Sequence, residues 1–356
     1  MLYIVHTTGQ CNLKCAYCGG SFDPRKVPWK IQYNPEYLKR FIEKDPEAVI
    51  AFYGGEPLLN PEFIMWAIDN VKAKHFVIQT NGTIPRSLPK DYWLKFDTIL
   101  LSIDGRQEVT DKYRGKGVYE KVIFTAEWLR TIGFTGDLIA RMTVTEDTDI
   151  YLDVMHLLSL KLFTHVHWQL DVVWSDRWKN FQQWRDASYL PGVRKLVDVW
   201  VEEMSRGTVL GIAPFKAIIT KTFIDNYVAP PCGAGVNSFS ILTDGRILAC
   251  PIAVEEKWAE LGNISQGKLS PESAPKIGEP CISCSYYRYC GGRCLYAYME
   301  RLWGENGFKE VCKATMGLID SLLEALPTIK NYLKEGRITL KDILYPPYNN
   351  TVEVIP

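Results

Sequence analysis

Three cysteines on one short stretch of chain are the clearest chemical signal in this sequence. Cys11, Cys15 and Cys18 are separated by three and two residues, so a single loop carries all three thiolates. Three thiolates on one loop can bind three irons of a cubic 4Fe–4S cluster, because such clusters take cysteine ligands. The fourth iron then remains open to another ligand. A closed structural zinc site is the alternative, but it usually takes four ligands, and no histidine lies close after Cys18.

The other seven cysteines lie far along the chain from these three. They are Cys232, Cys250, Cys281, Cys284, Cys290, Cys294 and Cys312. Disulfides are the ordinary interpretation of so many cysteines, but they suit small secreted domains, whereas this chain has 356 residues and no export signal. The clustered thiols therefore predict metal binding in a cytoplasmic protein.

The composition excludes several classes of protein. Hydrophobic residues make up 47% of the chain and charged residues 23%, which is typical of a folded globular protein. Basic and acidic residues both number 41, so no overall positive field exists to hold a nucleic acid. No apolar run reaches the roughly 18 residues of a membrane-spanning helix. We therefore expect neither a nucleic-acid partner nor a membrane.

The elements that position the first cysteines form a repeating pattern over residues 1–205. Short β-rich runs alternate with longer amphipathic segments, which predicts βα units on a parallel sheet. The predicted strands are Leu2–Thr7, Val49–Phe52, Phe76–Gln79, Thr98–Ile103, Leu138–Val144 and His165–Leu170. The predicted helices are Pro35–Lys44, Glu62–Lys72, Lys90–Leu94, Tyr119–Ile132, Ile150–Leu160 and Val193–Ser205. Six units predict an α/β fold, a partial (β/α)6 TIM-like barrel with its function at the carboxyl ends of the strands.

The composition changes after about residue 205, where glycine, proline, tyrosine and cysteine become dense. Ser238–Leu242 and Arg246–Cys250 predict a hairpin around an Asp-Gly turn. Regular helical periodicity returns only at Cys312–Leu333, and the tail Tyr345–Pro356 is expected to be extended. The predicted domains are a barrel over 1–205, a bridging segment over 206–231, a small cysteine-rich domain over 232–312, and a helix and tail over 313–356.

The cysteine loop resembles that of the radical S-adenosylmethionine (radical SAM) family, which has this spacing and an aromatic residue before the last cysteine, as Tyr17 is here. Gly54-Gly55-Glu56 is similar to the family's segment that receives the methionine amino group. The resemblance implies that Gln79, Ser102 and Arg141 lie near the methionine carboxylate and the ribose. The implied cofactor-binding residues are Gly54, Gly55, Glu56, Gln79, Asn81, Ser102 and Arg141.

Each of these later segments also has a plain structural interpretation. Gly54-Gly55 is compatible with an ordinary turn, as are the dipeptides Asn81-Gly82 and Asp104-Gly105. Arg141 on a strand is compatible with a surface ion pair. Their order at successive strand ends is what favours the cofactor site.

The C-terminal cysteines resemble those of the SPASM extension found in peptide- and protein-modifying radical SAM enzymes. The resemblance implies two auxiliary 4Fe–4S clusters and so three clusters in all. It assigns Cys281, Cys284, Cys290 and Cys312 to the outer cluster, and Cys232, Cys250 and Cys294 to the inner one. Ten thiolates leave the inner cluster without a fourth cysteine, and Asp225 is the nearest carboxylate.

Two departures from relatives narrow the expected activity. Sulfatase-maturating relatives carry a catalytic aspartate after the cysteine that corresponds to Cys250, and this chain has Pro251 there. The first predicted strand starts at residue 2, so we expect no N-terminal leader-binding domain.

The resemblance implies an enzyme that cleaves S-adenosylmethionine to a 5′-deoxyadenosyl radical, which removes hydrogen from a peptide or protein. It implies S-adenosylmethionine as cofactor, a low-potential electron donor of the ferredoxin or flavodoxin type, and anaerobic conditions. The run TTGQCNLKCAYCGGSF and the compact length resemble archaeal peptide-modifying radical SAM/SPASM proteins. The sequence identifies no catalytic base. A radical SAM enzyme of small metabolites, an iron–sulfur electron carrier and a zinc scaffold remain as alternatives.

Overall fold

The computed structural model describes residues 1–172, 178–224 and 230–345, which divide into two compact units. The first unit contains residues 1–103, 110–139 and 232–276, and the second contains the described residues of 104–109, 140–231 and 277–356. Asp225 and the expected extended tail beyond Tyr345 lie outside the described residues. No helix in the described part of the chain is both long and apolar enough to span a membrane.

The centre of the first unit is a parallel sheet. Its strands β1 (Leu2–Thr8), β2 (Val49–Gly54), β3 (His75–Thr80) and β4 (Thr98–Ser102) are neighbours in that order. All seven residues of β1 are buried, as expected for a parallel strand covered on both faces. Because the four strands run the same way, the loops that follow them leave from one edge of the sheet.

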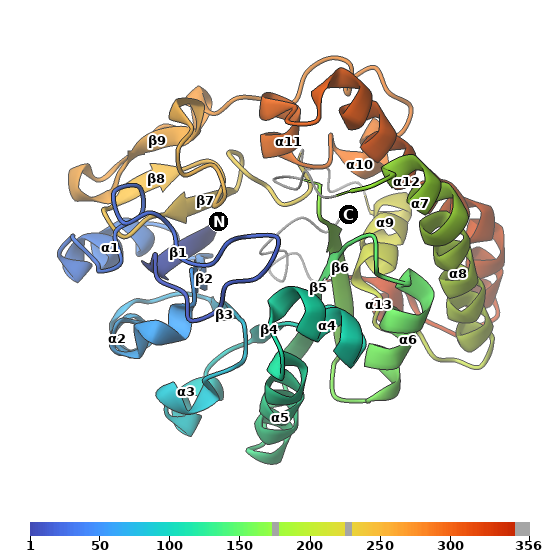
Figure 1. Cartoon of the computed structure of the whole chain (residues 1–356), viewed down its shortest axis with the longest axis horizontal. Coiled ribbons are helices and arrows are strands. Elements are labelled where there is room, and N and C mark those ends of the chain that lie inside the picture. The colour runs from blue at the N-terminus through green and yellow to red at the C-terminus, as the bar shows by residue number, and fades with distance from the viewer. Residues whose placement is uncertain (173–177, 225–229, 346–356) are drawn as a thin grey trace. The chain divides into compact units, whose positions relative to one another are not determined.

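A second set of strands extends this sheet from β1. Strand β7 (Ser238–Ile241) pairs with β1 in parallel, and β8 (Arg246–Leu248), β9 (Glu260–Asn263) and β10 (Lys268–Leu269) follow in antiparallel order. Figure 1 shows β7, β8 and β9 beside β1. The expected hairpin of β7 and β8 is confirmed, but its pairing with the first strand of the chain was not predicted.

Four helices of the first unit flank the sheet: α1 (Pro35–Ile42), α2 (Pro61–Asn70), α3 (Lys90–Trp93) and α5 (Val118–Thr131). Figure 1 shows α1, α2 and α3 on the outer side of the strands. Asn34 and Asn60 cap the first two, and a proline follows each cap, which is a favoured start for a helix. Strand β5 (Asp137–Val144) and helix α4 (Gln107–Arg114) each contribute residues to both units.

The second unit is mainly helical. Beside β6 (His165–Leu170) it contains the helices α6 (Ile150–Ser159), α7 (Phe181–Trp184), α8 (Leu190–Ser205), α9 (Ala213–Phe223), α10 (Tyr287–Cys290), α11 (Leu295–Glu300), α12 (Gly304–Lys334) and α13 (Leu340–Ile343). The long helix α12 packs against α8 so closely that a Cβ at Gly317 would lie 2.6 Å from the Leu190 side chain. An ion pair between Arg185 and Glu310 adds to this packing.

The expected elements are present with small shifts of their ends. Each of the six expected barrel strands lies within two residues of its predicted bounds, and β6 matches them. Helix α12, in contrast, begins at Gly304, eight residues before the predicted Cys312. Helices α4, α9, α10, α11 and α13 were not predicted. Helix α4 is short and strongly polar, and α9 lies in the segment that was expected to be a bridge.

Candidate functional site

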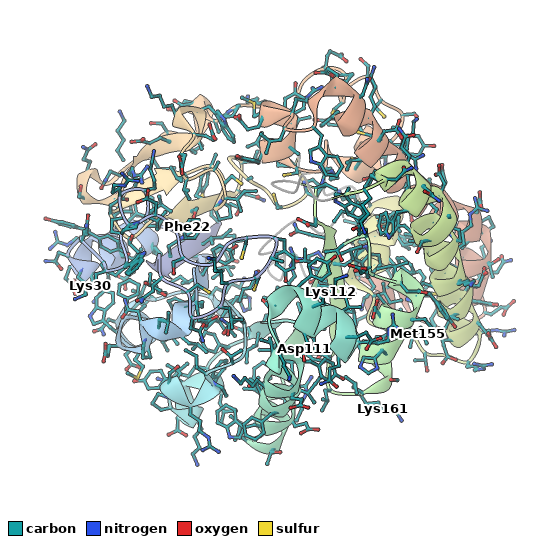
Figure 2. The ribbon with its side chains drawn as sticks, in the orientation of Figure 1. Phe22, Lys30, Asp111, Lys112, Met155 and Lys161 are labelled. Atoms are coloured by element: carbon teal, nitrogen blue, oxygen red, sulfur yellow. The ribbon has the colours of Figure 1, made fainter. Side chains whose placement is uncertain are left out.

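The first three cysteines lie on a loop that leaves β1 and closes on itself. The Phe22 N–H donates to the Gly9 carbonyl at 2.8 Å, which ties the two ends of the loop together, and Phe22 is labelled in Figure 2. The Ser21 hydroxyl accepts from the Cys11 N–H at 2.9 Å. Cys11 is half-buried, Cys15 is buried and Cys18 is exposed. The loop therefore holds its thiols at graded depths, with Cys18 nearest to solvent.

Several neighbouring groups affect the ionisation of the Cys11 thiol. The Leu13 N–H points at the Cys11 Sγ at 3.4 Å, and hydrogen bonds of this kind tune iron–sulfur centres. Burial raises the pKa of the Cys11 thiol, and the nearby Glu56 and Cys18 charges raise it further. Ligation by a metal would release the proton of such a thiol.

The Gly54-Gly55-Glu56 segment is in direct backbone contact with the start of the cysteine loop. The Gly55 N–H donates to the Thr8 carbonyl at 3.0 Å, and the Glu56 N–H donates to the Gln10 carbonyl at 2.8 Å. A Cβ at Gly55 would lie 2.3 Å from the Gln10 oxygen and 2.9 Å from the Cys11 nitrogen. Gly54 has φ of +144°, which side chains disfavour. Only glycine therefore allows this approach.

The Glu56 carboxylate joins the ends of two strands. It is buried and accepts from the Thr80 hydroxyl at 2.6 Å, the Asn81 N–H at 2.8 Å and the Leu58 N–H at 3.1 Å. Burial raises the Glu56 pKa to about 7, against the lowering effect of these three donors. Both oxygens of the carboxylate have protein donors, so Glu56 positions the loops that follow β2 and β3.

Asn81 connects the same strand end to the cysteine loop. Its side-chain amide donates to the Asn12 Oδ1 at 2.7 Å, and the Asn12 amide in turn donates to the Thr83 hydroxyl at 2.9 Å. Asn12 follows Cys11 directly. The loops after β1, β2 and β3 are therefore cross-linked by side chains at the carboxyl edge of the sheet.

Gln79 and Ser102 complete the residues that the first unit brings to this edge. Gln79 lies one residue before the end of β3, and its Oε1 is buried without a hydrogen-bond partner. A buried acceptor without a donor is costly, so it favours a ligand with a hydroxyl or ammonium group there. Ser102 is buried and ends β4.

Arg141 belongs to the second unit, within β5. Its guanidinium donates to the Met142 carbonyl at 2.8 Å and pairs with the Gln169 side chain on β6. These contacts place the arginine inside the second unit rather than in a surface ion pair.

Four C-terminal cysteines surround one cavity of the second unit. Cys281, Cys284, Cys290 and Cys312 line it, together with apolar side chains such as Phe308. Burial, together with the neighbouring Cys312, raises the pKa of Cys281 to about 11 and that of Cys290 to about 12. No three His, Cys, Asp or Glu side chains among the described residues are grouped as ligands of a single metal ion.

Cationic side chains lie around these four thiols. Arg293 lines the cavity, and its charge lowers the pKa of Cys312 against the dominant effect of burial. Lys221 on α9 donates to the Tyr289 carbonyl at 2.9 Å, next to Cys290. Burial lowers the Lys221 pKa to about 8, and the Cys290 charge opposes that shift. Tyr286 and Tyr287 also line the cavity.

The three remaining cysteines are divided between the units. Cys232 precedes β7 and Cys250 follows β8. Both therefore lie at the open end of that hairpin, in the first unit. Cys294 caps α11 in the second unit, where its Sγ accepts from the Ala297 N–H at 3.4 Å.

Comparison with known proteins identifies the part of the chain that carries the first loop. Residues 5–158 match the model of the radical SAM superfamily. These residues form a radical SAM domain. The match begins inside β1 and ends within α6, so it includes the cysteine loop, the Gly54-Gly55-Glu56 segment and Asn81.

The similarity to other proteins extends beyond this radical SAM domain. The chain is 25% identical over 334 residues to the cysteine-type anaerobic sulfatase-maturating enzyme of Clostridium perfringens, covering 82% of this chain and 88% of that protein. It is 26% identical over 324 residues to the mycofactocin maturase MftC of Mycolicibacterium smegmatis, covering 82% and 76%. The solved structure of anSMEcpe with bound AdoMet and Cp18Cys peptide is similar with a TM-score of 0.69 and 19% identity, covering 94% and 99%. These matches confirm the expected α/β partial-barrel fold and the expectation of a radical SAM enzyme.

The residues present fit the groups that such a domain implies. The first loop offers thiols and a backbone donor to sulfur, and Gln79 offers a buried acceptor without a partner. The second unit offers four thiols around an apolar cavity. Both donor sets match the cysteine ligation of iron–sulfur clusters.

Several residues of the site were missed by sequence reasoning. Asn12 and Thr80 contribute to the network around Asn81 and Glu56, and Tyr113 packs against the cysteine loop. Lys221 contacts the loop of the outer cysteines from a helix that was not predicted. These are long-range contacts, and no local pattern in the sequence signals them.

Proposed function

We propose that this chain is a radical SAM enzyme that modifies a peptide or protein. The observation that carries the proposal is the backbone contact between Gly55 and the start of the cysteine loop, where a Cβ would lie 2.3 Å from the Gln10 oxygen. This contact couples the segment expected to hold the methionine end of S-adenosylmethionine to the loop expected to hold the cleavage cluster.

The proposed cofactor site uses the residues predicted from the sequence. Cys11, Cys15 and Cys18 hold a 4Fe–4S cluster, which supplies one electron for the reductive cleavage of S-adenosylmethionine when bound. The binding residues are Gly54, Gly55, Glu56, Gln79, Asn81, Ser102 and Arg141. Glu56 fixes the two loops, and Gln79 Oε1 accepts a hydrogen bond from the cofactor.

Two auxiliary 4Fe–4S clusters complete the proposed cofactor set. The cavity of the second unit supports an outer cluster on Cys281, Cys284, Cys290 and Cys312. An inner cluster on Cys232, Cys250 and Cys294 leaves one iron without a cysteine ligand. The proposed domains are the barrel over 1–205, the bridge over 206–231, the SPASM domain over 232–312, and the helix and tail over 313–356.

The activities and ligands of similar proteins support a peptide or protein as the substrate. The sulfatase-maturating enzyme and MftC are maturases, and the anSMEcpe structure holds a peptide. The reaction proposed for this chain differs from sulfatase maturation, because Pro251 stands where the resemblance expects the catalytic aspartate. We extend the resemblance to archaeal peptide-modifying radical SAM/SPASM proteins. A low-potential ferredoxin or flavodoxin is the proposed electron donor.

The proposed setting is an anaerobic cytoplasm. All ten cysteines are thiols rather than disulfides in the structure, and cluster ligation needs reduced thiols. An open cluster edge is also destroyed by oxygen.

The proposal is tested by anaerobic incubation with dithionite, S-adenosylmethionine and a peptide encoded beside the gene. We expect 5′-deoxyadenosine and a peptide mass change that fragment mass spectrometry places on one residue. The control replaces Cys11, Cys15 and Cys18 with alanine, which should abolish 5′-deoxyadenosine while iron remains bound at the C-terminal cysteines. Cleavage by that triple variant would contradict the assignment. Cleavage without any peptide or protein modification would favour a small-metabolite substrate instead.

A further inference from the structure

A basic segment of the chain packs against the loop of the first three cysteines. The Ala16 N–H donates to the Tyr113 carbonyl at 2.7 Å. The Tyr17 and Tyr113 rings stack with their centroids 6.1 Å apart, and the Arg114 guanidinium lies 5.4 Å from the centroid of Tyr17. Tyr17 directly precedes Cys18, so these contacts fix residues 113 and 114 beside the exposed end of the loop.

The charges of this segment are strongly one-sided. Residues 110–121 contain four basic side chains, Lys112, Arg114, Lys116 and Lys121, and two acidic ones, Asp111 and Glu120, in a chain with no net charge. Lys14, on the cysteine loop itself, adds a fifth basic side chain. All four of these lysines are exposed. We call Lys14, Lys112, Lys116 and Lys121 the basic surface.

One of the two acidic residues, Asp111, accepts hydrogen bonds from backbone groups of the same segment. The Asp111 carboxylate accepts from the Gly117 N–H and the Tyr119 N–H, both at 2.9 Å, and so holds the start of α5. Lys112 lies over the Tyr113 ring, with its Nζ 5.7 Å from the centroid. Figure 2 labels Asp111 and Lys112 on α4. The Lys112 charge therefore lies beside Tyr113, which stacks on Tyr17 of the cysteine loop.

We infer that the basic surface is the docking site of an acidic, low-potential electron-transfer protein. The inference rests on the proposed function, because an electron must enter the cluster on Cys11, Cys15 and Cys18 from outside the chain. Cys18 is the most exposed of these three, and Tyr17, the residue before it, contacts Tyr113 and Arg114 of the basic segment. Transient redox complexes are small, and complementary charge mainly raises their rate of association.

The electron balance of this step is simple. The reduced donor loses one electron for each cleavage event. That electron breaks one carbon–sulfur bond of S-adenosylmethionine, giving methionine and a 5′-deoxyadenosyl radical. The protein partner is needed only for delivery, so a small reductant at saturating concentration bypasses the basic surface.

The test compares two electron sources for the complete enzyme with all its clusters. The variant Lys112→Glu/Lys116→Glu is assayed for 5′-deoxyadenosine formation with a reduced acidic flavodoxin and, separately, with dithionite. The matched control is Lys330→Glu/Lys334→Glu on α12, which makes the same change in net charge elsewhere. We expect the first variant to raise the KM for flavodoxin on the order of ten-fold and to flatten its salt dependence, with the dithionite rate unchanged. The control should match the wild type with both reductants.

Several outcomes would overturn the inference. An unchanged KM for flavodoxin is one, and an equal effect of the α12 control is another. A raised KM for the peptide substrate with an unchanged KM for flavodoxin would make the basic surface a substrate site instead. If the double variant loses iron, the single variant Lys116→Glu is assayed in its place. Lys116 lies exposed in the loop between α4 and α5, so its replacement should not disturb the fold. A wild-type enzyme that fails to cleave S-adenosylmethionine with dithionite would refute the proposed function, not the docking site alone.

Discussion

Replacing Gly55 with alanine should impair S-adenosylmethionine cleavage and also lower the stability of the fold. The added Cβ would lie 2.3 Å from the Gln10 oxygen, whereas ordinary contacts begin at 3.4 Å, so the two segments must separate by about 1 Å. That movement breaks the hydrogen bond from the Glu56 N–H to the Gln10 carbonyl, now 2.8 Å. A displacement of about 1 Å in a positioned site can reduce the rate about 100-fold. We expect an effect of about 10- to 100-fold on cleavage, with a stability loss of about 1–3 kcal/mol.

The assay measures 5′-deoxyadenosine formation per cluster, together with S-adenosylmethionine affinity and the melting temperature. Gly133→Ala is the matched control, because Gly133 has φ of +92° and no atom lies within 4 Å of the position that its Cβ would take. It should lose about 1 kcal/mol of stability with cleavage unchanged, since only its backbone conformation is strained. Wild-type affinity and cleavage in Gly55→Ala, at full iron content, would refute the coupling of the two segments.

Three further predictions follow from other buried groups. Glu56→Gln replaces one carboxylate oxygen by an amide nitrogen, which cannot accept from the Asn81 N–H. The variant should lose about 1–3 kcal/mol of stability and bind S-adenosylmethionine more weakly in calorimetry; unchanged affinity would leave Glu56 a purely structural residue. His6 is fully buried, which lowers its pKa to about 3, so the unfolded chain binds its proton first and stability should fall as the pH drops below about 6.5. The loss at pH 5 is about 2 kcal/mol in urea unfolding, and His6→Phe should remove it; an equal pH slope in the variant would contradict this. Lys221→Met removes a charge next to Cys290, so the proposed outer cluster should become harder to reduce, by on the order of tens of millivolts in a spectroscopic titration. An unchanged reduction potential would show that the Lys221 charge does not act on that cluster.

Local sequence determined the elements and the chemistry of the first loop. The strands of the barrel are apolar runs set between turn residues, and the helices begin at capping asparagines and prolines, so both are encoded by neighbouring residues. The three cysteines lie within eight residues, and their spacing alone predicts a shared cluster. Glycine at positions 54 and 55 indicated a close approach, but not the group that approaches.

Tertiary structure decided which distant groups meet. Only folding shows that Glu56 accepts from Thr80 and Asn81, because the residues come from strands that are adjacent in the sheet and separated in sequence. The pairing of β7 with β1 joins residues more than 230 positions apart, and no local pattern encodes it. The contact of Tyr113 with Tyr17 is of the same kind. Side-chain identity is a local property, whereas hydrogen bonds and packing between segments depend on the path of the whole chain.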